Sequence, residues 1–361
     1  MYTVHNGNFQ EIIERVRHGE VIYLLVIGTT DTSLIPGITI AGASPELTHY
    51  TPIADAEYLL LGSCKSISTI PVTPDGKPTP AVISRACLNI LKIPTMIVNA
   101  GCRIKPKIPY IDLNGEPGRD IRTGKALDVE VVEEILTDGK ILGRELSKKF
   151  DVLIIGESIP AGTTTAMAFL VGLGYNAWGR VSSASPINPK ELKIMIVKEA
   201  LRNVELNSKD PVTVVSKVGD PVIIGISSIV LGFLENNGSV VLAGGTQMIA
   251  ILAFLKHYVN LKDIQRRLAI CTTRWIVNDK SADMIGLARE VYEDITIVSA
   301  NLNFKDMPYP GLKAYEEGFV KEGVGAGGLT VITLVRGYGL DTIYREVIKE
   351  YEELLRKGKL K

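Results

Sequence analysis

The chain has 361 residues, 46% of them hydrophobic, and its 40 Lys and Arg residues balance its 40 Asp and Glu residues. This length suffices for one large domain or two smaller ones, and the apolar content favours a thick core. Balanced charge without a basic stripe disfavours a non-specific nucleic-acid-binding protein. The four cysteines lie far apart, the first residues lack the layout of a signal peptide, and the apolar stretches are too short to cross a bilayer. We therefore expect a cytoplasmic protein that binds no membrane and has no zinc site or disulfide.

Short apolar runs alternate with longer amphipathic segments along the chain. The runs predict strands at Val21–Ile27, Ala56–Leu61, Thr95–Val98, Val152–Ile155, Val240–Leu242, Leu268–Thr272 and within Val291–Ser299, with a possible edge strand at Tyr110–Leu113. The segments predict helices at Phe9–Val16, Ala81–Leu91, Asp128–Phe150, Thr163–Leu173, Glu191–Asn203, Pro221–Leu234, Met248–Leu255 and Asp341–Lys357. This alternation predicts an α/β fold with an open, mainly parallel, Rossmann-like sheet and helices on both faces.

The segment Val152–Gly174 combines a buried strand, a loop of small residues and an apolar helix, VLIIGESIPAGTTTAMAFLVGLG. A helix start attracts phosphate because its N–H groups and its dipole both point at the anion. Threonines at the front of this helix can cap it. Glu157 is unexpected in such a loop because a carboxylate repels phosphate. A substrate with a phosphate and a nearby cationic centre would tolerate both.

Ligands of open parallel sheets bind beyond the carboxyl ends of the strands. A second isolated acid, Glu322, lies in such a loop and precedes four glycines in KEGVGAGGL. So many glycines suggest a loop shaped around a ligand; the alternative is a flexible solvent loop with an incidental Glu. The turns Gly219-Asp220 and Ala243–Gln247 are interpreted as tight turns that allow packing. From its position alone, Lys193 is interpreted as a surface lysine, with a cation for a substrate anion as the alternative.

Several motifs of common enzyme classes are absent. No G-x-G-x-x-G follows a strand, and Gly172-Leu173-Gly174 ends a helix and better suits a C-cap. The Walker A and G-x-S-x-G motifs are absent too, and the four histidines are scattered. A nicotinamide-dependent oxidoreductase is therefore weakly supported.

Two motifs nevertheless resemble those of a known family, the nicotinate-nucleotide:dimethylbenzimidazole phosphoribosyltransferases. They are GESIPAGTTTA around Glu157 and KEGVGAGG around Glu322, in matching order and separation. Between them, Glu191-Leu192-Lys193 resembles the start of the family's lysine-led helix, and VGDPVIIG and VVLAGGTQMIAIL resemble its glycine turn and substrate loop. The resemblance covers most of the chain and is closest to an archaeal related branch.

The resemblance implies a reaction and roles for residues. In this family a benzimidazole nitrogen displaces nicotinate from C1′ of nicotinate mononucleotide, giving α-ribazole 5′-phosphate for cobalamin assembly. Glu322 would be the general base, Glu157 would lie near the ribose or the departing ring, and Lys193 would offset charge. Substrate binding would fall to Gly162, Thr163, Thr164, Ser182, Ser183, Gly219, Gly244, Gly245, Thr246, Gln247, Thr273, Gly323 and Gly325. No cofactor or metal is implied, and the family is usually a homodimer.

The predicted terminal helices, Phe9–Val16 and Asp341–Lys357, suggest the domain boundaries. Residues 20–335 would form an α/β nucleotide-binding catalytic domain. Residues 1–19 and 336–361 would form a small helical subdomain from the two ends of the chain.

This chain also departs from the family pattern. Pro160 stands just before the threonines and removes a backbone donor from the anion loop. The segment that would bind the base offers Thr79, Pro80, Ser84 and Arg85. Adenine, a phenolic compound and a substituted benzimidazole are therefore all open as the accepted base. The alternative functions are a non-catalytic nucleotide-binding protein on the same fold and, less favoured, an NAD-dependent oxidoreductase.

Overall fold

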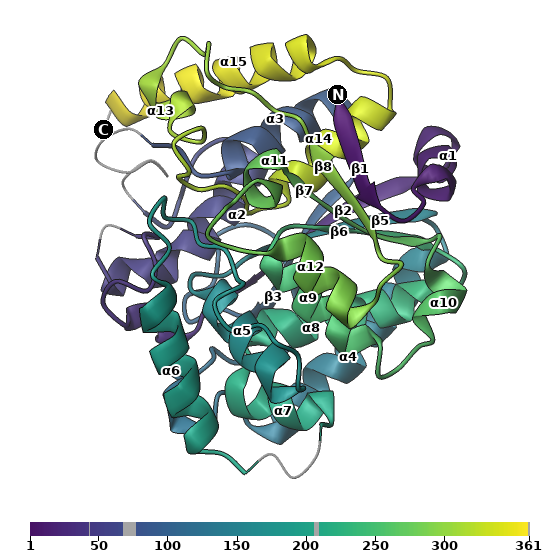
Figure 1. Cartoon of the computed structure of the whole chain (residues 1–361). Helices are drawn as coiled ribbons and strands as arrows, with labels where there is room; N and C mark the ends of the chain where they lie inside the picture. The colour runs from purple at the N-terminus through teal and green to yellow at the C-terminus, as the bar shows by residue number, and fades with distance from the viewer. Residues whose placement is uncertain (43, 68–76, 206–208, 360–361) are drawn as a thin grey trace.

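The computed structural model describes residues 1–42, 44–67, 77–205 and 209–359, and in these an eight-stranded sheet forms the centre (Figure 1). The strand order is β1-β8-β7-β6-β5-β2-β3-β4; neighbours are parallel except β1, which is antiparallel to β8. The strands are β1 (Tyr2–Asn6), β2 (Val21–Gly28), β3 (Thr95–Gly101), β4 (Ile111–Asp112), β5 (Val152–Ser158), β6 (Ser239–Ala243), β7 (Leu268–Thr273) and β8 (Thr296–Ala300). The predicted open, mainly parallel α/β sheet is confirmed.

Helices cover both faces of this sheet, as Figure 1 shows. They are α1 (Gln10–His18), α2 (Thr51–Leu61), α3 (Ala81–Leu91), α4 (Val129–Ser147), α5 (Gly162–Gly172), α6 (Lys190–Arg202), α7 (Pro211–Val218), α8 (Pro221–Leu234), α9 (Thr246–Leu255), α10 (Leu261–Ile264), α11 (Arg274–Val277), α12 (Met284–Val291), α13 (Pro310–Lys313), α14 (Ala326–Val335) and α15 (Leu340–Lys359). Short 3-10 helices are η1 (Asp31–Leu34), η2 (Glu46–Tyr50) and η3 (Ile121–Thr123).

Alternation along β2 shows how the two layers of the core form. Successive side chains of a strand point to opposite faces of the sheet. Ile22, Leu24 and Val26 pack with α5, α8 and α9, whereas Tyr23 and Leu25 pack with α3, α14 and α15. Because both faces are covered, nearly every residue of the central strands is apolar.

One expectation about an individual element is wrong, and one strand was missed. The residues predicted as a strand at Ala56–Leu61 belong to α2. This helix is apolar almost all round because it is buried, and so it lacks the amphipathic period; Pro52 in its first turn and left-handed Gly62 after its end are the helix signals. The edge strand β1 was not predicted, since YTVHN is short and half polar. Of the proline-rich segment Pro71–Pro80, residues 71–76 lie outside the described residues.

Both terminal helices bury their apolar side chains in the main core. Ile12 and Val16 of α1 and Val347 and Leu354 of α15 belong to the same buried cluster as β2 and α14. The division into a catalytic domain and a small terminal subdomain stays a prediction.

The order of the strands places a crevice in the middle of the sheet. From β2 the chain runs outward through β3 to β4, and then returns to place β5, β6, β7 and β8 on the other side of β2. The switch point therefore lies between the carboxyl ends of β2 and β5, where ligands of this architecture bind.

Candidate active site

A cavity of about 310 Å³ lies at this switch point. Its walls come from the segment after β2, from α2, from residues 77–80 before α3, from the end of β5 with the start of α5, and from the loops before α6, α9 and α14. Many lining side chains are apolar, among them Ile38, Ile40, Ala54, Pro80 and Val324. A cavity of this volume, apolar with a few polar groups, suits a small organic ligand.

Glu157 is the penultimate residue of β5 and faces this cavity. Its side chain is 6% exposed, and its Oε2 accepts a hydrogen bond from the Ile159 N–H at 3.1 Å. Burial, and then the charges of Asp220 and Glu322, raise the pKa of Glu157 to about 8. A cation that enters the cavity would therefore stabilise the ionised form of Glu157.

Glu322 lines the cavity from the loop before α14 and is held by four donors. Oε2 accepts from Thr272 Oγ1 at 3.0 Å and from the Thr273 N–H at 2.8 Å. Oε1 accepts from the N–H groups of Gly323 and Gly327, at 3.2 and 3.1 Å. These donors favour the carboxylate, but burial outweighs them and raises the pKa of Glu322 to about 7.

The loop that carries Glu322 is strained at Val324. This β-branched residue has φ +53°, a left-handed conformation that costs free energy for any residue but glycine. Its carbonyl accepts hydrogen bonds from Tyr23 Oη at 2.6 Å and Ser84 Oγ at 2.8 Å, and its N–H donates to the Glu157 carbonyl at 2.9 Å. The loop is therefore a shaped element, and the alternative of a flexible solvent loop is wrong.

Lys193 lies behind the start of α5, on α6, and is not a surface lysine as its position in the sequence suggested. Its side chain is 1% exposed, and its Nζ donates to Thr163 Oγ1 at 2.9 Å and to the Ser182 carbonyl at 2.6 Å. Burial, and then the charge of Lys321, lower the pKa of Lys193 to about 7. Because Thr163 Oγ1 accepts a hydrogen bond from Lys193, its own O–H can donate into the cavity.

The start of α5 differs in detail from the predicted phosphate cradle. Ala161, with φ +63°, is the N-cap residue and no threonine side chain caps the helix, so the expected threonine cap is wrong. The N–H groups of Gly162 and Thr164 donate to the carbonyls of Ile159 and Ala161. An anion here would rely on the helix dipole and on Thr163 rather than on these two amides.

The structure brings ten of the predicted site residues together around the cavity. They are Glu157, Gly162, Thr163, Ser182, Ser183, Gly245, Thr246, Gln247, Glu322 and Gly323. The Ser182 hydroxyl is turned to Asp279, to which it donates at 2.6 Å, and Thr246 Oγ1 accepts from the Ser182 N–H.

Six predicted residues do not line the cavity. Lys193 and Thr273 act through the contacts already described. Thr164 is buried in α5, Gly219 precedes α8, and Gly244 lies between β6 and α9. Gly325, with φ +73°, starts α14 against the Tyr23 ring.

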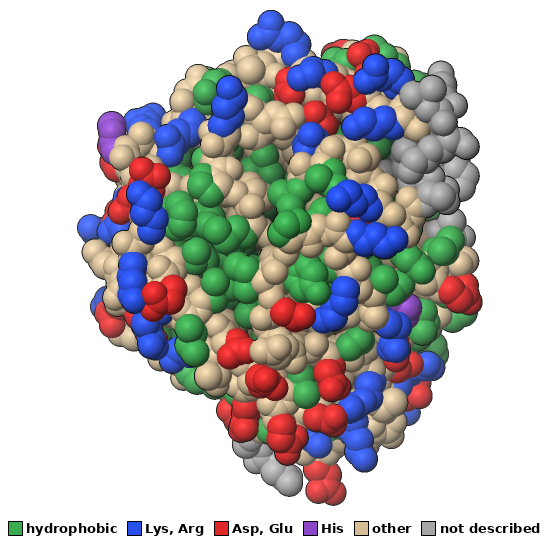
Figure 2. All heavy atoms as spheres, turned by 180° about the vertical axis from the view of Figure 1, so that it is seen from behind, with side chains coloured by type: hydrophobic (Ala, Val, Ile, Leu, Met, Phe, Trp, Pro, Cys, Tyr) green, Lys and Arg blue, Asp and Glu red, His purple; other side chains and the backbone are tan. Residues whose placement is uncertain are grey.

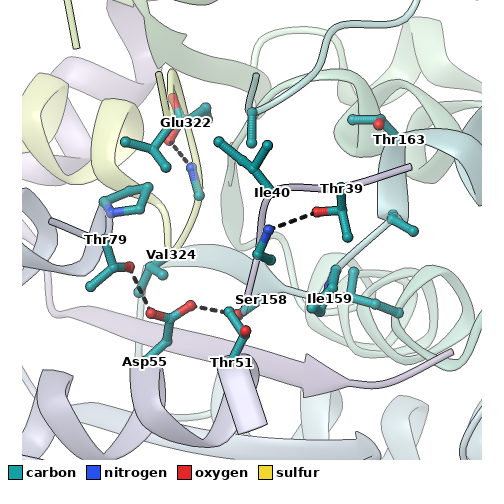
Figure 3. A pocket seen from close by; sticks show the side chains of 18 of the residues that line it. Thr39, Ile40, Thr51, Asp55, Thr79, Ser158, Ile159, Thr163, Glu322 and Val324 are labelled. Atoms are coloured by element: carbon teal, nitrogen blue, oxygen red, sulfur yellow. Dashed lines mark hydrogen bonds between the residues drawn. The ribbon is translucent and has the colours of Figure 1, made fainter. Parts of the chain in front are cut away.

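Two buried acids near the site were not predicted. Asp55 of α2 lines the cavity, and Figure 3 shows it beside Thr79 and Ser158. Asp220 caps α8, accepts from Thr165 Oγ1 at 2.5 Å and helps to raise the pKa of Glu157. An acid inside the apolar run TPIADAEYLLL was the signal for Asp55, but it requires the run to be recognised as a helix.

Of the residues expected to bind the base, Thr79 and Pro80 line the cavity. Ser84 holds the Val324 carbonyl instead, and Arg85 pairs with Glu350 at 2.8 Å. In the described part of the chain no group of three or more His, Cys, Asp or Glu side chains is placed to hold a metal ion.

The fold and the site together define an open α/β protein with a cavity at the switch point of its sheet, lined by carboxyl groups of raised pKa. The phosphoribosyltransferase family model matches residues 81–265. A UPF0284 protein of Sulfurisphaera tokodaii is 54% identical over 353 residues, 97% of each chain, and a UPF0284 protein of Saccharolobus solfataricus is 54% identical over 335 residues, 92% of this chain and 93% of the relative. The chain belongs to this phosphoribosyltransferase family, in a related archaeal branch formed by the UPF0284 proteins.

Solved structures share this fold. Nicotinate-nucleotide-dimethylbenzimidazole phosphoribosyltransferase from Thermus thermophilus superimposes with a TM-score of 0.61 at 14% identity, covering 91% of this chain and 83% of that one. The structure of CobT from the same organism gives 0.60 at 16% identity, covering 91% and 84%.

Proposed function

We propose that this protein transfers the 5-phosphoribosyl group of nicotinate mononucleotide to an aromatic nitrogen base. A ring nitrogen of the base forms a bond to C1′ with its lone pair. The bond from C1′ to the nicotinate nitrogen breaks, and its electron pair neutralises the pyridinium ring. The proton on the other ring nitrogen of the base passes to a carboxylate. The products are nicotinate and an α-ribazole-type 5′-phosphate, the nucleotide-loop precursor of a cobamide.

The observation that carries this proposal is the pair of carboxylates, Glu157 and Glu322, at one cavity beside two helix starts. Positive charge is present on the pyridinium and develops on the ribose, and a buried carboxylate stabilises it most strongly where water is excluded. The helix starts at α5 and α9 offer the phosphate end a favourable potential. The Thermus thermophilus enzyme of this fold is named for nicotinate nucleotide and for one aromatic nitrogen base, dimethylbenzimidazole.

The roles follow from the contacts of each side chain. Glu157 lines the cavity, only its Oε2 accepts a hydrogen bond among the described residues, and it would face the pyridinium or the ribose. Glu322 would take the proton of the base, with the Gly323 N–H, the most distant of its four donors, yielding its place. Lys193 would orient Thr163 toward the phosphate and supply a positive charge behind it.

The test is incubation of the protein with nicotinate mononucleotide and a panel of benzimidazoles, purines and phenols, read by mass spectrometry. Nicotinate and a base ribotide should form together in equal amounts. Binding of nicotinate mononucleotide without turnover for any base would favour the non-catalytic nucleotide-binding protein. Failure to bind nicotinate mononucleotide would overturn the proposal, and binding of NAD by calorimetry would revive the oxidoreductase.

The proposal extends to a cytoplasmic homodimer. The described part of the chain has no helix that is both long and apolar enough to cross a membrane. Figure 2 shows hydrophobic side chains gathered in the middle of one face, with charged side chains around the rim. An apolar area of this kind is what a second subunit would cover.

A further inference from the structure

Among the described residues that line the cavity, Asp55 is the acid to which the proposed reaction assigns no task. It lies in the middle of α2, is 5% exposed, and points into the cavity in Figure 3. Figure 3 also shows it apart from Glu322 along the cavity wall, with Val324 nearer to Asp55. Asp55 would therefore contact a different part of a bound ligand than Glu322 does.

The hydrogen bonds of Asp55 fix it as an acceptor. Oδ1 accepts from Thr79 Oγ1 at 2.6 Å and Oδ2 accepts from Ser158 Oγ at 2.7 Å. Thr79 Oγ1 itself accepts from the Ala81 N–H at 3.2 Å, so its own proton must point at Asp55. Each carboxylate oxygen has a second lone pair, and no donor among the described residues uses it, which leaves it available to a ligand.

Within the described residues no cation neutralises this carboxylate. Asp55 forms no ion pair there with Lys, Arg or His, and its pKa is raised to about 6 by burial. The cavity is also lined by apolar side chains, among them Ala54, Pro80 and Val324. A bound ring would displace water from this carboxylate. If the ring presented only methyl or C–H groups here, it would not replace the hydrogen bonds that the water had made.

We propose that Asp55 selects, as acceptor of the phosphoribosyl group, a heteroaromatic base with a second hydrogen-bond donor, an exocyclic N–H or O–H. This inference rests on the proposed function and names the class of its acceptor. The ring N–H of the base supplies the proton that leaves in the reaction, and the exocyclic donor binds Asp55. A site built to bind a donor discriminates strongly against analogues that lack it.

Two matched pairs of bases test this in the wild-type protein. Adenine differs from purine by an exocyclic amine, and 5-hydroxybenzimidazole differs from benzimidazole by a hydroxyl. Calorimetric titration of the protein with each base should give about 10–100-fold tighter binding for the donor-bearing member, as a hydrogen bond to a charged group provides. Equal binding within both pairs would overturn the inference without any variant.

The variant Asp55→Asn should reduce the preference within each pair to about threefold or less, because its amide offers one acceptor oxygen and competes with the two hydroxyl donors. The matched control is Asp112→Asn, since Asp112 pairs with Lys105 at 3.0 Å and does not line the cavity. Thermal unfolding establishes that each variant is folded. A loss of nicotinate mononucleotide binding with an unchanged base preference would assign Asp55 to the ribose instead and overturn the inference.

Base binding and turnover are measured separately, so the two proposals fail separately. Discrimination within the pairs without any transfer to C1′ would leave the role of Asp55 intact and contradict the proposed function. Transfer to donor-bearing and donor-free bases at equal kcat/KM and with equal affinity would support the proposed function and contradict the role of Asp55.

Discussion

At the scale of single residues, the two glutamates of the cavity differ in how their charge is stabilised. Glu322 has four donors that hold its carboxylate in one orientation, whereas Glu157 accepts from a single backbone N–H. The same type of side chain is thus held in one orientation at Glu322 and is left with few donors at Glu157. Their pKa values of about 7 and 8 follow this order.

Glu322→Gln should lower kcat by about 10²–10⁴-fold and leave nicotinate mononucleotide binding within about twofold, because a general base acts only in the transition state. In the wild-type protein kcat should rise as the pH rises through about 7, since Glu322 must be ionised to accept a proton. Steady-state kinetics and calorimetry measure both. The control is Glu317→Gln, an exposed position outside the cavity. A fully active Glu322→Gln protein would refute the assignment of the base.

Glu157 should release a proton when nicotinate mononucleotide binds. At pH 7 a group with a pKa of about 8 is mostly protonated, and a pyridinium cation beside it lowers that pKa. Calorimetry in buffers of different ionisation enthalpy counts the protons. The wild-type protein should release up to about one proton per site more than Glu157→Gln, and the contribution of Lys193 is common to both. Identical counts would show that the cation does not approach Glu157.

At the scale of elements, α14 and β7 hold the loop that carries Glu322 between them. Glu322 accepts from Thr272 and Thr273 at the end of β7 and from Gly327 in the first turn of α14. A Cβ at Gly327 would lie 2.0 Å from the Thr272 carbonyl carbon and 2.3 Å from the Thr273 nitrogen. The glycine is therefore required for the helix to pack this close to the strand.

Gly327→Ala should lower the free energy of unfolding by about 1–3 kcal/mol because the backbone of β7 or α14 must move. Activity should fall further than stability alone would explain, since three of the donors of Glu322 lie on these two backbones and on Thr272. The control is Gly339→Ala, where a Cβ would meet nothing within 4 Å. Urea unfolding measures the free energy of unfolding of both variants, and steady-state kinetics measures their activity. Equal stability of the two variants would contradict the packing argument.

Elements with a clear period were predictable from the sequence, and elements whose period is hidden by burial were not. The β-branched runs of β2 and β5 and the small-residue loops after β5 and β6 predicted the parallel sheet and much of the site. α2 has no polar face and was misread as a strand, so Asp55 was missed with it. Lys193 was misjudged because sequence position cannot show that α6 packs behind the start of α5.

At the scale of the whole molecule, the switch point unites segments that are distant in the sequence. Residues 38–42, 157–163, 245–247 and 322–324 meet at one cavity because β2 lies beside β5. A ligand that contacts all of them binds only the folded state, so its binding energy adds to global stability.

Nicotinate mononucleotide at 100 times its Kd should therefore raise the free energy of unfolding by about 2.7 kcal/mol. Nicotinate riboside at the same concentration, which lacks the phosphate, should stabilise by at least about 1.4 kcal/mol less, the equivalent of tenfold weaker binding. Thermal unfolding at several ligand concentrations measures both. Equal stabilisation by the two compounds would show that the starts of α5 and α9 do not anchor the phosphate.

The antiparallel strand β1 also has a consequence for the order of assembly. Its Thr3 bonds to Asn301 beside β8, 298 residues further along the chain. At a synthesis rate of about 5–20 residues per second, β1 leaves the ribosome about 15–60 s before its partner. During that interval the strand has no partner strand to pair with. The pairing of β1 with β8 is therefore a late, long-range event in folding.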